Sequence, residues 1–382
     1  MLETTERSFI DDNISVIHQS AFGAAAISKR GSTLEVGLYF DLRNPPQWHR
    51  PWARTYGFAL EMCEEAERLG ADSVWLSEHH QFEDGYLPQP LTMAAAIAAR
   101  TKRVRIGTAV LLAPLRHAAH IAEEAAVVDN LSDGRLDLGL GAGYRLAEFD
   151  LFGADHESRY RTTDATVRAL RRYWEAGALT PPPVQPRIPI WMGYNGPGGA
   201  RRAGILGEGL LSLQPDLLPP YLDGLAKGGH PPAAARMSGV LDVYSTDDPE
   251  RDWPIVAERF RYQRDSYARY TAEGSDDVHR RRLVAATDPD QARAAGLGSS
   301  GQGGLLYGTP EHNARNIRRH LAGMPVRTVF FWVSLAGMPD DVVARHVQII
   351  CSSLRLLLSD EDDGARSASG SDPGSQRSPT SS

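Results

Sequence analysis

ADSVWLSEHH (Ala71 to His80), RVRIGTAVLLAP (Arg103 to Pro114) and RLDLGLGAGY (Arg135 to Tyr144) are three short apolar runs, and each ends in polar or glycine-rich residues. Runs of this length and composition are typical of buried parallel strands. A β/α barrel places its catalytic side chains in this way, because the carboxyl ends of its parallel strands meet at one face. These segments therefore predict a barrel with a site at that face.

The same alternation of strand and helix continues along the chain. The predicted strands are 34–40, 73–77, 104–112, 136–140, 188–192, 210–213, 237–244 and 328–333. The predicted helices are 52–69, 91–100, 118–131, 159–174, 198–206 and 341–358. Eight strands in this rhythm predict a closed α/β TIM barrel rather than an open doubly wound sheet.

Three segments are expected to lie outside the regular barrel at 34–359. Residues 1–33 have no sustained period and are interpreted as an N-terminal extension. Residues 360–382 are mostly Ser, Gly, Pro, Ala and Thr, which cannot bury enough surface to order themselves, so a disordered tail is expected. The stretch 272–304 is interpreted as an insertion near the mouth of the barrel.

Composition excludes several classes of protein. The chain has 41 Lys and Arg against 48 Asp and Glu, a net charge of −7, which argues against a nucleic-acid partner. No apolar run approaches the roughly 18 residues of a membrane span, and the N-terminus lacks a signal core, so a cytoplasmic protein is expected. Cys63 and Cys351 are the only cysteines, which excludes a cysteine-based zinc spacing and makes a disulfide framework implausible.

The end of the second predicted strand carries Glu78, His79 and His80. Alternation along a strand turns His79 to the face opposite its neighbours, so one imidazole is expected at the barrel mouth. Histidine can accept a proton there, and an adjacent carboxylate can fix its tautomer. Two alternatives are a histidine pair that only caps the strand and a metal site completed by His117 or His120.

Two glycine-rich turns are candidate ligand sites. Gly139, Gly141 and Gly143 stand at alternate positions, where absent side chains leave room for a planar ring or a phosphate. The segment 193–202 (GYNGPGGARR) leads from a strand into a helix, whose free N–H groups can bind phosphate with help from Arg201 or Arg202. The alternative for each is a turn that needs only backbone flexibility.

Taken together, five ordered motifs resemble the bacterial luciferase-like family of flavin-dependent monooxygenases and oxidoreductases. They are Ala66 to His80, Arg103 to Pro114, Ala122 to Arg135, Gly139 to Phe149 and Pro189 to Ala203. The resemblance implies a β/α barrel with the cofactor ring across its mouth. The cofactor in relatives is reduced FMN, commonly supplied by a separate flavin reductase, or coenzyme F420. It also implies a homodimer paired through helices beside the second and third strands.

The resemblance also implies roles for particular residues. His79 matches the active-site histidine, with Glu78 and His80 beside it as candidate catalytic residues. Ala109 and Val110 match a non-prolyl cis peptide under the ring. The residues expected to contact the ring or its phosphate are Gly141, Gly143, Tyr144, Asn195, Gly196, Gly198, Gly199 and Arg201. Two departures are Ala142, where the luciferase has an arginine on the phosphate, and a phosphate turn without the hydroxyl side chains of many FMN-binding relatives.

The resulting hypothesis is a monooxygenase that uses reduced FMN and O2 to oxidise a small organic substrate, apolar or carbonyl-bearing, with no metal. The main alternative is an F420-dependent oxidoreductase that transfers a hydride without O2. A flavin carrier without turnover and a metal-dependent hydrolase barrel are further alternatives. The sequence leaves FMN and F420 both open, because a Gly-Pro phosphate turn also occurs in deazaflavin-dependent relatives.

Overall fold

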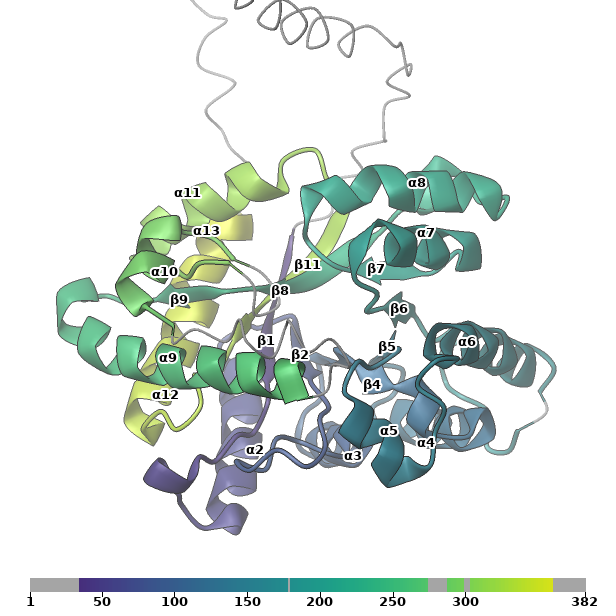
Figure 1. The fold of residues 1–382 in the computed structure, drawn as a ribbon, viewed down its shortest axis with the longest axis horizontal. Coiled ribbons are helices and arrows are strands. Elements are labelled where there is room, and N and C mark those ends of the chain that lie inside the picture. Colours follow the sequence, from purple (N-terminus) through teal and green to yellow (C-terminus); the bar gives the residue numbers. More distant parts are fainter. Residues whose placement is uncertain (1–33, 178, 274–286, 299–302, 360–382) are drawn as a thin grey trace, which may run out of the picture. The chain divides into compact units, whose positions relative to one another are not determined.

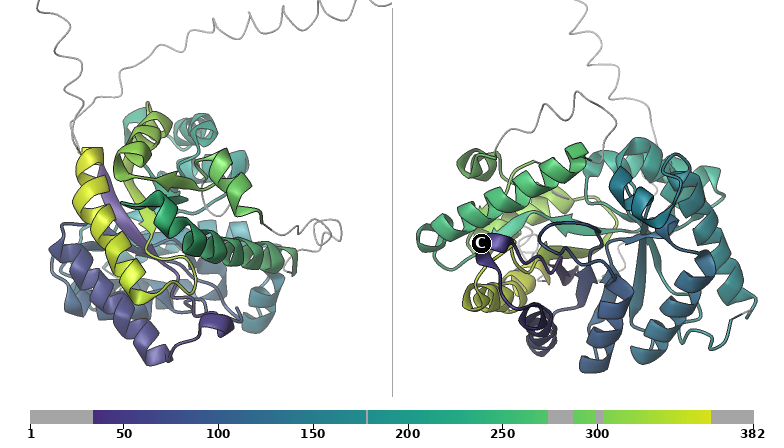
Figure 2. Two further views of the ribbon diagram at one scale, coloured as in Figure 1. Left: turned by 90° about the vertical axis from the view of Figure 1, so that its left-hand side faces the viewer. Right: turned by 60° about the horizontal axis from the view of Figure 1, so that its bottom comes forward.

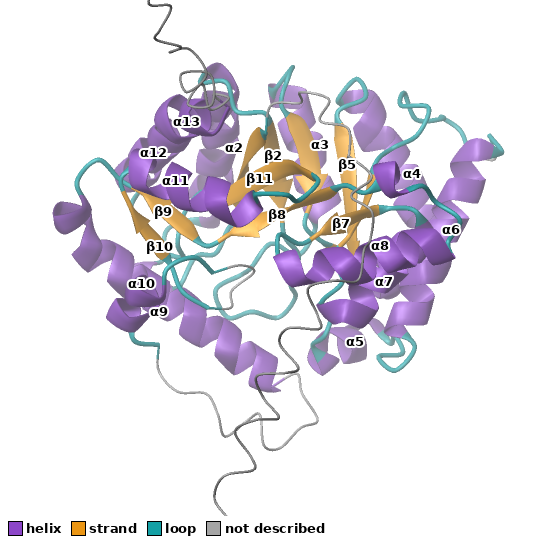
Figure 3. Ribbon diagram, turned by 90° about the horizontal axis from the view of Figure 1, so that it is seen from above, coloured by secondary structure: helices purple, strands orange, loops and turns teal. Residues whose placement is uncertain are grey.

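The structure is a computed structural model that describes residues 34–359, apart from 178, 274–286 and 299–302. The predicted extension at 1–33 and the predicted tail at 360–382 lie outside the described residues, as does part of the predicted insertion at 272–304. Figures 1 and 3 show strands at the centre of the described part, surrounded by helices.

The central strands form a closed parallel barrel, as predicted. They are β1 (Glu35–Phe40), β2 (Ser73–Leu76), β3 (Arg105–Thr108), β4 (Leu111–Leu112), β5 (Leu136–Gly141), β6 (Ile190–Met192), β7 (Gly209–Leu211), β8 (Met237–Leu241) and β11 (Val326–Trp332). The sheet runs β3-β2-β1-β11-β8-β7-β6-β5, and both β3 and β4 pair with β5 to close it. Because all of these pairings are parallel, the carboxyl ends of the strands meet at one face.

The third barrel strand is broken in two. The strand predicted at 104–112 becomes β3 and β4, separated by Ala109 and Val110, whose peptide bond is cis, as the resemblance implies. Gly141 and Gly193 lie beside this break, and a Cβ added to either would meet a Val110 methyl group at 2.3 Å. These glycines therefore leave space for the Val110 side chain, which lies between β5 and the end of β6.

Helices cover the outside of the barrel (Figures 1 and 2). Those predicted from the sequence are α2 (Trp52–Arg68), α3 (Pro90–Arg100), α4 (Ala118–Leu131), α6 (Arg159–Glu175), α7 (Gly196–Leu206) and the pair α12 (Asp340–Ile349) and α13 (Arg355–Ser359), joined by a π-helical turn at Ile350–Leu354. Those not predicted are α5 (Leu146–Phe152), α8 (Leu218–Lys227), α9 (Pro249–Glu273), α10 (Pro289–Ala295) and α11 (Pro310–Leu321).

The chain leaves the barrel after β8. The strand predicted at 237–244 divides at Asp242, and its second part, β9 (Val243–Ser245), pairs in parallel with β10 (Leu306–Gly308) in a separate small sheet. Helices α9 and α10 lie between these two strands in the sequence. Helix α9, green in Figure 1, crosses in front of the barrel strands, and Figure 3 shows it from above.

Aromatic side chains fill the inside of the barrel. Tyr39, Trp75, Trp191, Val240, Phe330 and Trp332 form one buried cluster. Each indole N–H is satisfied by a side-chain oxygen, that of Trp75 by Ser73, that of Trp191 by Asp137 and that of Trp332 by Asp242. These hydrogen bonds fix the three indole rings, of which Trp332 lines the cavity described below.

The run Asp340–Ser359 is long and apolar enough to cross a membrane by length and composition alone, contrary to the expectation from sequence. It contains α12 and α13, which contact α2 and β1 of the barrel. Val343, Val347 and Leu354 are buried, because this face of the run packs on the barrel core. The run is therefore part of the outer helical layer.

Candidate active site

A cavity of about 480 Å³ opens at the carboxyl ends of the barrel strands. Side chains from β1, from β11 and from the segment after β2 line it, as do the turns after β5 and β6 and, from outside the barrel, Tyr267 and Thr271 of α9. The predicted site residues that line it are Glu78, His79, Ala109, Val110, Gly141, Gly143, Tyr144 and Asn195. His80, Gly196, Gly198, Gly199 and Arg201 are not part of its wall.

His79 is held in the cavity wall by a buried carboxylate. Its Nδ1 lies 2.8 Å from Oε1 of Glu148, whose side chain is fully buried. Burial acts to raise the pKa of Glu148, but the hydrogen bond and charge of His79, with help from the His80 N–H and Arg145, bring that pKa below its usual value. Because an ionised Glu148 can only accept, Nδ1 carries a proton, and in the neutral form of the ring Nε2 is the acceptor.

Aromatic rings fix the orientation of the His79 imidazole. It stacks on Phe82 with ring centroids 4.7 Å apart, and it meets the edges of Tyr86 at 4.8 Å and Tyr144 at 5.5 Å. Burial, followed by the charge of Glu148, raises the pKa of Tyr144 to about 12, so its hydroxyl stays protonated at neutral pH. The imidazole is thus positioned in a largely apolar wall, and it can exchange a proton with a ligand at Nε2.

Glu78 and His80, predicted as catalytic neighbours of His79, have structural contacts. Oε2 of Glu78 accepts the N–H of Leu112 at 2.8 Å, and its Oε1 lies 2.6 Å from Arg116 and 2.7 Å from Nε2 of His80. The His80 ring packs against Phe152. Both side chains therefore position β4 and its following turn, and of the three predicted residues His79 alone presents a ring to the cavity.

The sequence analysis did not single out Glu148. It lies on α5, a helix of seven residues that ends at Gly153, a left-handed residue with φ of 63°. Arg145 begins this helix and donates to the carbonyl of His80 at 2.6 Å, which ties α5 to the end of β2. The local signal was an acidic residue in the first turn of a short helix, which is ordinary capping chemistry and does not by itself indicate a partner for histidine.

The end of the cavity wall formed by Asn195 and Arg159 is suited to a phosphate. Asn195 lines it and is the N-cap of α7, an eleven-residue helix whose first residue, Gly196, has φ of 71°. The first N–H groups of such a helix lack partners within the helix and attract anions. Arg201 does not join this end, because its Nε donates to Asp223 at 2.6 Å, and Arg202 contacts Asp164.

Arg159 is a cation at this end that the sequence analysis missed. It lines the cavity together with His156, and its Nη1 donates to the carbonyl of His156 at 2.8 Å. Its Nε is buried without a hydrogen-bond partner among the described residues. Such a group is costly to bury unless a ligand satisfies it. Arg159 therefore offers a positive charge that Ala142, the residue at the luciferase arginine position, cannot.

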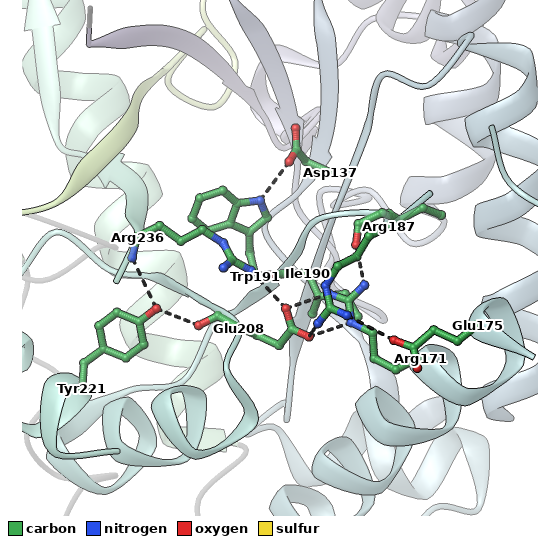
Figure 4. A network of polar contacts seen from close by, with 10 residues as sticks. Asp137, Arg171, Glu175, Arg187, Ile190, Trp191, Glu208, Tyr221 and Arg236 are labelled. Atoms are coloured by element: carbon green, nitrogen blue, oxygen red, sulfur yellow. Dashed lines mark hydrogen bonds and ion pairs between the residues drawn. The ribbon is translucent and has the colours of Figure 1, made fainter. Parts of the chain in front are cut away.

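A second cavity, also about 480 Å³, lies at the opposite end of the barrel beside Glu208. Figure 4 shows the polar contacts around this residue. Glu208 is buried just before β7 and contacts Arg171 through both oxygens, at 2.6 and 2.7 Å. Arg187 and Arg236 approach it at 3.1 and 3.0 Å. Since the carboxylate has these arginine partners and lies near the amino ends of the strands, we interpret the cluster as stabilising.

The described part of the chain contains no group of three or more His, Cys, Asp or Glu side chains that could hold a metal ion. The sequence-based alternative with His117 or His120 needs their side chains near His79. His117 instead caps α4, where its Nδ1 accepts the N–H of Ala119 at 3.2 Å. Cys63 and Cys351 are both buried and free.

Comparisons with known proteins agree with this geometry. A family model described as luciferase-like monooxygenase matches residues 35–328. The chain is 28% identical over 275 residues to the F420-dependent glucose-6-phosphate dehydrogenase of Amycolatopsis mediterranei, covering 62% of this chain and 82% of that protein. It is 31% identical over 158 residues to the oxygenase component of the flavin-dependent trigonelline monooxygenase of Acinetobacter baylyi, covering 37% of this chain and 44% of that protein.

The fold is shared with solved structures. The crystal structure of the monooxygenase RslO1 from Streptomyces bottropensis superposes with a TM-score of 0.67 and 24% identity, covering 84% of this chain and 98% of that one. Relatives thus include both flavin monooxygenases and F420-dependent dehydrogenases. With a barrel of this topology, a cavity at the carboxyl ends of its strands and a match over most of its length, the chain belongs to the luciferase-like monooxygenase family.

Proposed function

We propose that the protein is a monooxygenase that uses reduced FMN and O2 to oxidise a small organic substrate. The observation that supports this proposal most directly is the presence of two features in one cavity. His79, held by Glu148, lines it, and so do Arg159 and Asn195, the N-cap of α7. A ligand that places a ring beside the first and a phosphate beside the second fits this arrangement.

The residues present fit a flavin phosphate on chemical grounds. The unpartnered Nε of Arg159 and the first N–H groups of α7 supply donors and positive charge. Gly141 and Gly143 line the same cavity without side chains. Reduced FMN, when bound, supplies the electrons that activate O2.

The protein's own contribution is proton transfer and exclusion of water. Nε2 of His79 accepts a proton from the substrate and returns it later, while the ionised Glu148 stabilises the imidazolium formed in between. Tyr39, Phe330 and Trp332 form an apolar wall of the cavity and keep bulk water from the reacting atoms. Glu148 acts through His79 and is a positioning residue.

The alternative is an F420-dependent oxidoreductase that moves a hydride without O2. It is favoured by the 28% identity to an F420-dependent dehydrogenase, an alignment that covers more of this chain than the trigonelline monooxygenase alignment does. The same phosphate end and the same histidine would serve a deazaflavin. The Glu-His-His motif at 78–80 leads us to prefer FMN.

An anaerobic titration separates the two cofactors. Purified protein is titrated with reduced FMN and, separately, with reduced F420, and oxygen uptake is then measured on admission of air. We expect reduced FMN to bind and oxygen uptake by the complex to depend on His79. Binding of F420 alone, with no oxygen reaction, would replace the proposal by hydride transfer, and binding of neither would leave a barrel without redox function.

Three further elements of the proposal come from sequence and resemblance. We propose a cytoplasmic location, a homodimer paired through α3 and its neighbours, and a separate reductase that supplies the flavin. Gel filtration with light scattering tests the dimer. The supply of flavin is tested by adding an NAD(P)H:flavin reductase. We expect activity to require this reductase and photoreduced FMN to substitute for it.

A further inference from the structure

We propose that the inner end of the cavity binds a neutral aromatic hydroxyl group, so that the substrates of this protein are phenols. This inference rests on the proposed function and narrows its substrate class. It is carried by four hydroxyl side chains that line one part of the cavity, those of Tyr39, Ser77, Tyr86 and Tyr267. We call these residues the hydroxyl cluster.

The hydroxyl cluster joins residues that are far apart in the sequence. Tyr39 and Ser77 lie on β1 and just after β2, Tyr86 lies in the loop before α3, and Tyr267 comes from α9 outside the barrel. The hydroxyl groups of Tyr86 and Tyr267 are hydrogen-bonded to each other. Polar tips on aromatic rings that converge inside a buried cavity are typical of a site that orients one oxygen of a ligand.

Counting protons shows which kind of ligand group the cluster favours. The Tyr39 hydroxyl donates to the carbonyl of Ala109, and the Ser77 hydroxyl donates to the carbonyl of Phe40. One further proton is used between Tyr86 and Tyr267. Three of the four protons are therefore committed, whereas each hydroxyl oxygen has two acceptor positions. The cluster has spare acceptors and little spare donor capacity. It therefore favours a ligand group that donates a hydrogen bond and disfavours a carbonyl group, which can only accept one.

The charges behind the cluster favour a neutral donor. Asp41 and Asp84 are buried there with one buried arginine, Arg43, whose Nε lies 2.7 Å from Asp84. Oδ2 of Asp41 has no hydrogen-bond partner among the residues described. Burial raises the pKa values of Tyr86 and Tyr267 well above the ordinary value, so both keep their protons. Asp84 offsets the charge of Arg43, and Asp41 adds a negative charge when it is ionised, so these groups supply no net positive charge to attract a carboxylate or a phenolate.

The surrounding rings favour an aromatic ligand. Trp332 packs 4.5 Å from Tyr39 and 6.5 Å from Tyr267, measured between ring centroids, and it lines the cavity with Phe330. Flat walls of this kind pack best against a flat ring. The His79 ring lies 4.8 Å from Tyr86 and 6.2 Å from Tyr267, so a phenol held by the cluster lies near the His79 ring.

A pair of ligands that differ in one donor tests the inference. Binding of 2-naphthol and of 2-methoxynaphthalene to the full chain is measured by calorimetry and by quenching of tryptophan fluorescence. In the wild type we expect 2-naphthol to bind about tenfold or more tightly, because the ether cannot donate a hydrogen bond. Equal affinities for the two ligands would overturn the proposal, and this comparison needs no variant to fold.

Variants then locate the preference. Tyr86→Phe, Tyr267→Phe and the double variant keep the rings and remove the hydroxyls, and we expect the preference to fall below about threefold in the double variant. Tyr307→Phe is the matched control, because its hydroxyl donates to the carbonyl of Pro249 away from the cavity. A preference unchanged in a folded double variant would contradict the assignment.

The same proteins distinguish this inference from the proposed function. Reduced FMN and reduced F420 are titrated into the wild type and the double variant, with neither naphthalene present. If the double variant loses the 2-naphthol preference and still binds reduced FMN, both proposals are supported. A 2-naphthol preference in a protein that binds only F420 would retain the phenol site and overturn the monooxygenase. A wild type that binds reduced FMN but shows no preference for 2-naphthol would retain the monooxygenase and overturn the phenol site.

Discussion

Nδ1 of His79 lies 2.8 Å from Oε1 of Glu148, and the same oxygen accepts the backbone N–H of His80 at 3.0 Å. One buried carboxylate oxygen therefore fixes both the ring and the backbone at the end of β2. Replacing Glu148 by Gln removes the charge and lets the side-chain amide donate to Nδ1, which favours the opposite tautomer.

For Glu148→Gln we expect turnover to fall about 10- to 100-fold, with little change in affinity for reduced FMN. Nitrogen-15 NMR of the imidazoles should show the Nδ1–H tautomer of His79 in the wild type and its loss in the variant. Glu123→Gln, an exposed change on α4, is the control. An unchanged His79 tautomer in the variant would show that Glu148 does not set the protonation of the ring.

Arg159→Ala should weaken cofactor binding through the phosphate. We expect the dissociation constant for FMN to rise about 10- to 100-fold, because a charge-assisted contact is lost, and the affinity for riboflavin, which lacks the phosphate, to stay the same. Arg201→Ala is the comparison, since Arg201 is paired with Asp223 outside the cavity. Equal loss for FMN and riboflavin would place Arg159 away from the phosphate.

The close approach of Gly141 to Val110 predicts that one substitution destabilises the fold and that a second one partly restores its stability. A Cβ at Gly141 would lie 2.3 Å from a Val110 methyl group, so Gly141→Ala should cost about 1–3 kcal/mol in the free energy of unfolding. Val110→Ala in the same chain removes that methyl group and should restore part of the loss. Urea unfolding of the single and double variants measures both effects, and additive losses would contradict the predicted contact.

Asp41 predicts a pH dependence of stability. Its burial, partly offset by Arg43, raises its pKa from 3.8 to about 7. The folded state therefore holds this proton more tightly than the unfolded state, and stability from this group falls as the pH rises from about 4 to about 7. Asp41→Asn should match the wild type near pH 4 and gain relative stability above pH 7. A constant difference across this range would show that Asp41 does not titrate.

Glu208 should be important for stability and not for the reaction. Glu208→Gln leaves three arginines around a neutral side chain, and we expect about 3–5 kcal/mol of destabilisation in urea unfolding. Glu175→Gln, the exposed partner of Arg187, should cost less than about 1 kcal/mol. Reduced FMN should bind the folded fraction of each variant normally, and weakened binding would link this cluster to the cavity.

Local sequence patterns predicted the barrel well. Each of the eight predicted strands is present. A buried strand can be recognised from its own short apolar run, bounded by glycine and polar residues, without knowledge of its partners. Two of those strands are divided, at Ala109–Val110 and at Asp242, and both breaks depend on contacts with other segments. Helices α8 and α11 escaped prediction although both are amphipathic and α11 begins at a Pro after a capping Thr309.

The site was predicted where one segment carries its chemistry and missed where distant segments combine. His79 at a strand end was identifiable from its position. Glu148 and Arg159 were not, because each is an ordinary residue of a helical segment until the fold brings it to the cavity. Arg201 shows the converse, since its place after a glycine turn indicated a phosphate contact and Asp223 on the next helix binds it instead.

Helix α9 lies between β9 and β10, outside the barrel, yet it places Tyr267 and Thr271 in the cavity wall. The phosphate end, by contrast, is formed by α6 and α7, which follow barrel strands. One part of the cavity wall is therefore encoded in a stretch of the chain that is separate from α6 and α7. Exchanging 249–273 between relatives would change the wall at Tyr267 and Thr271 while the residues that α6 and α7 contribute stay the same.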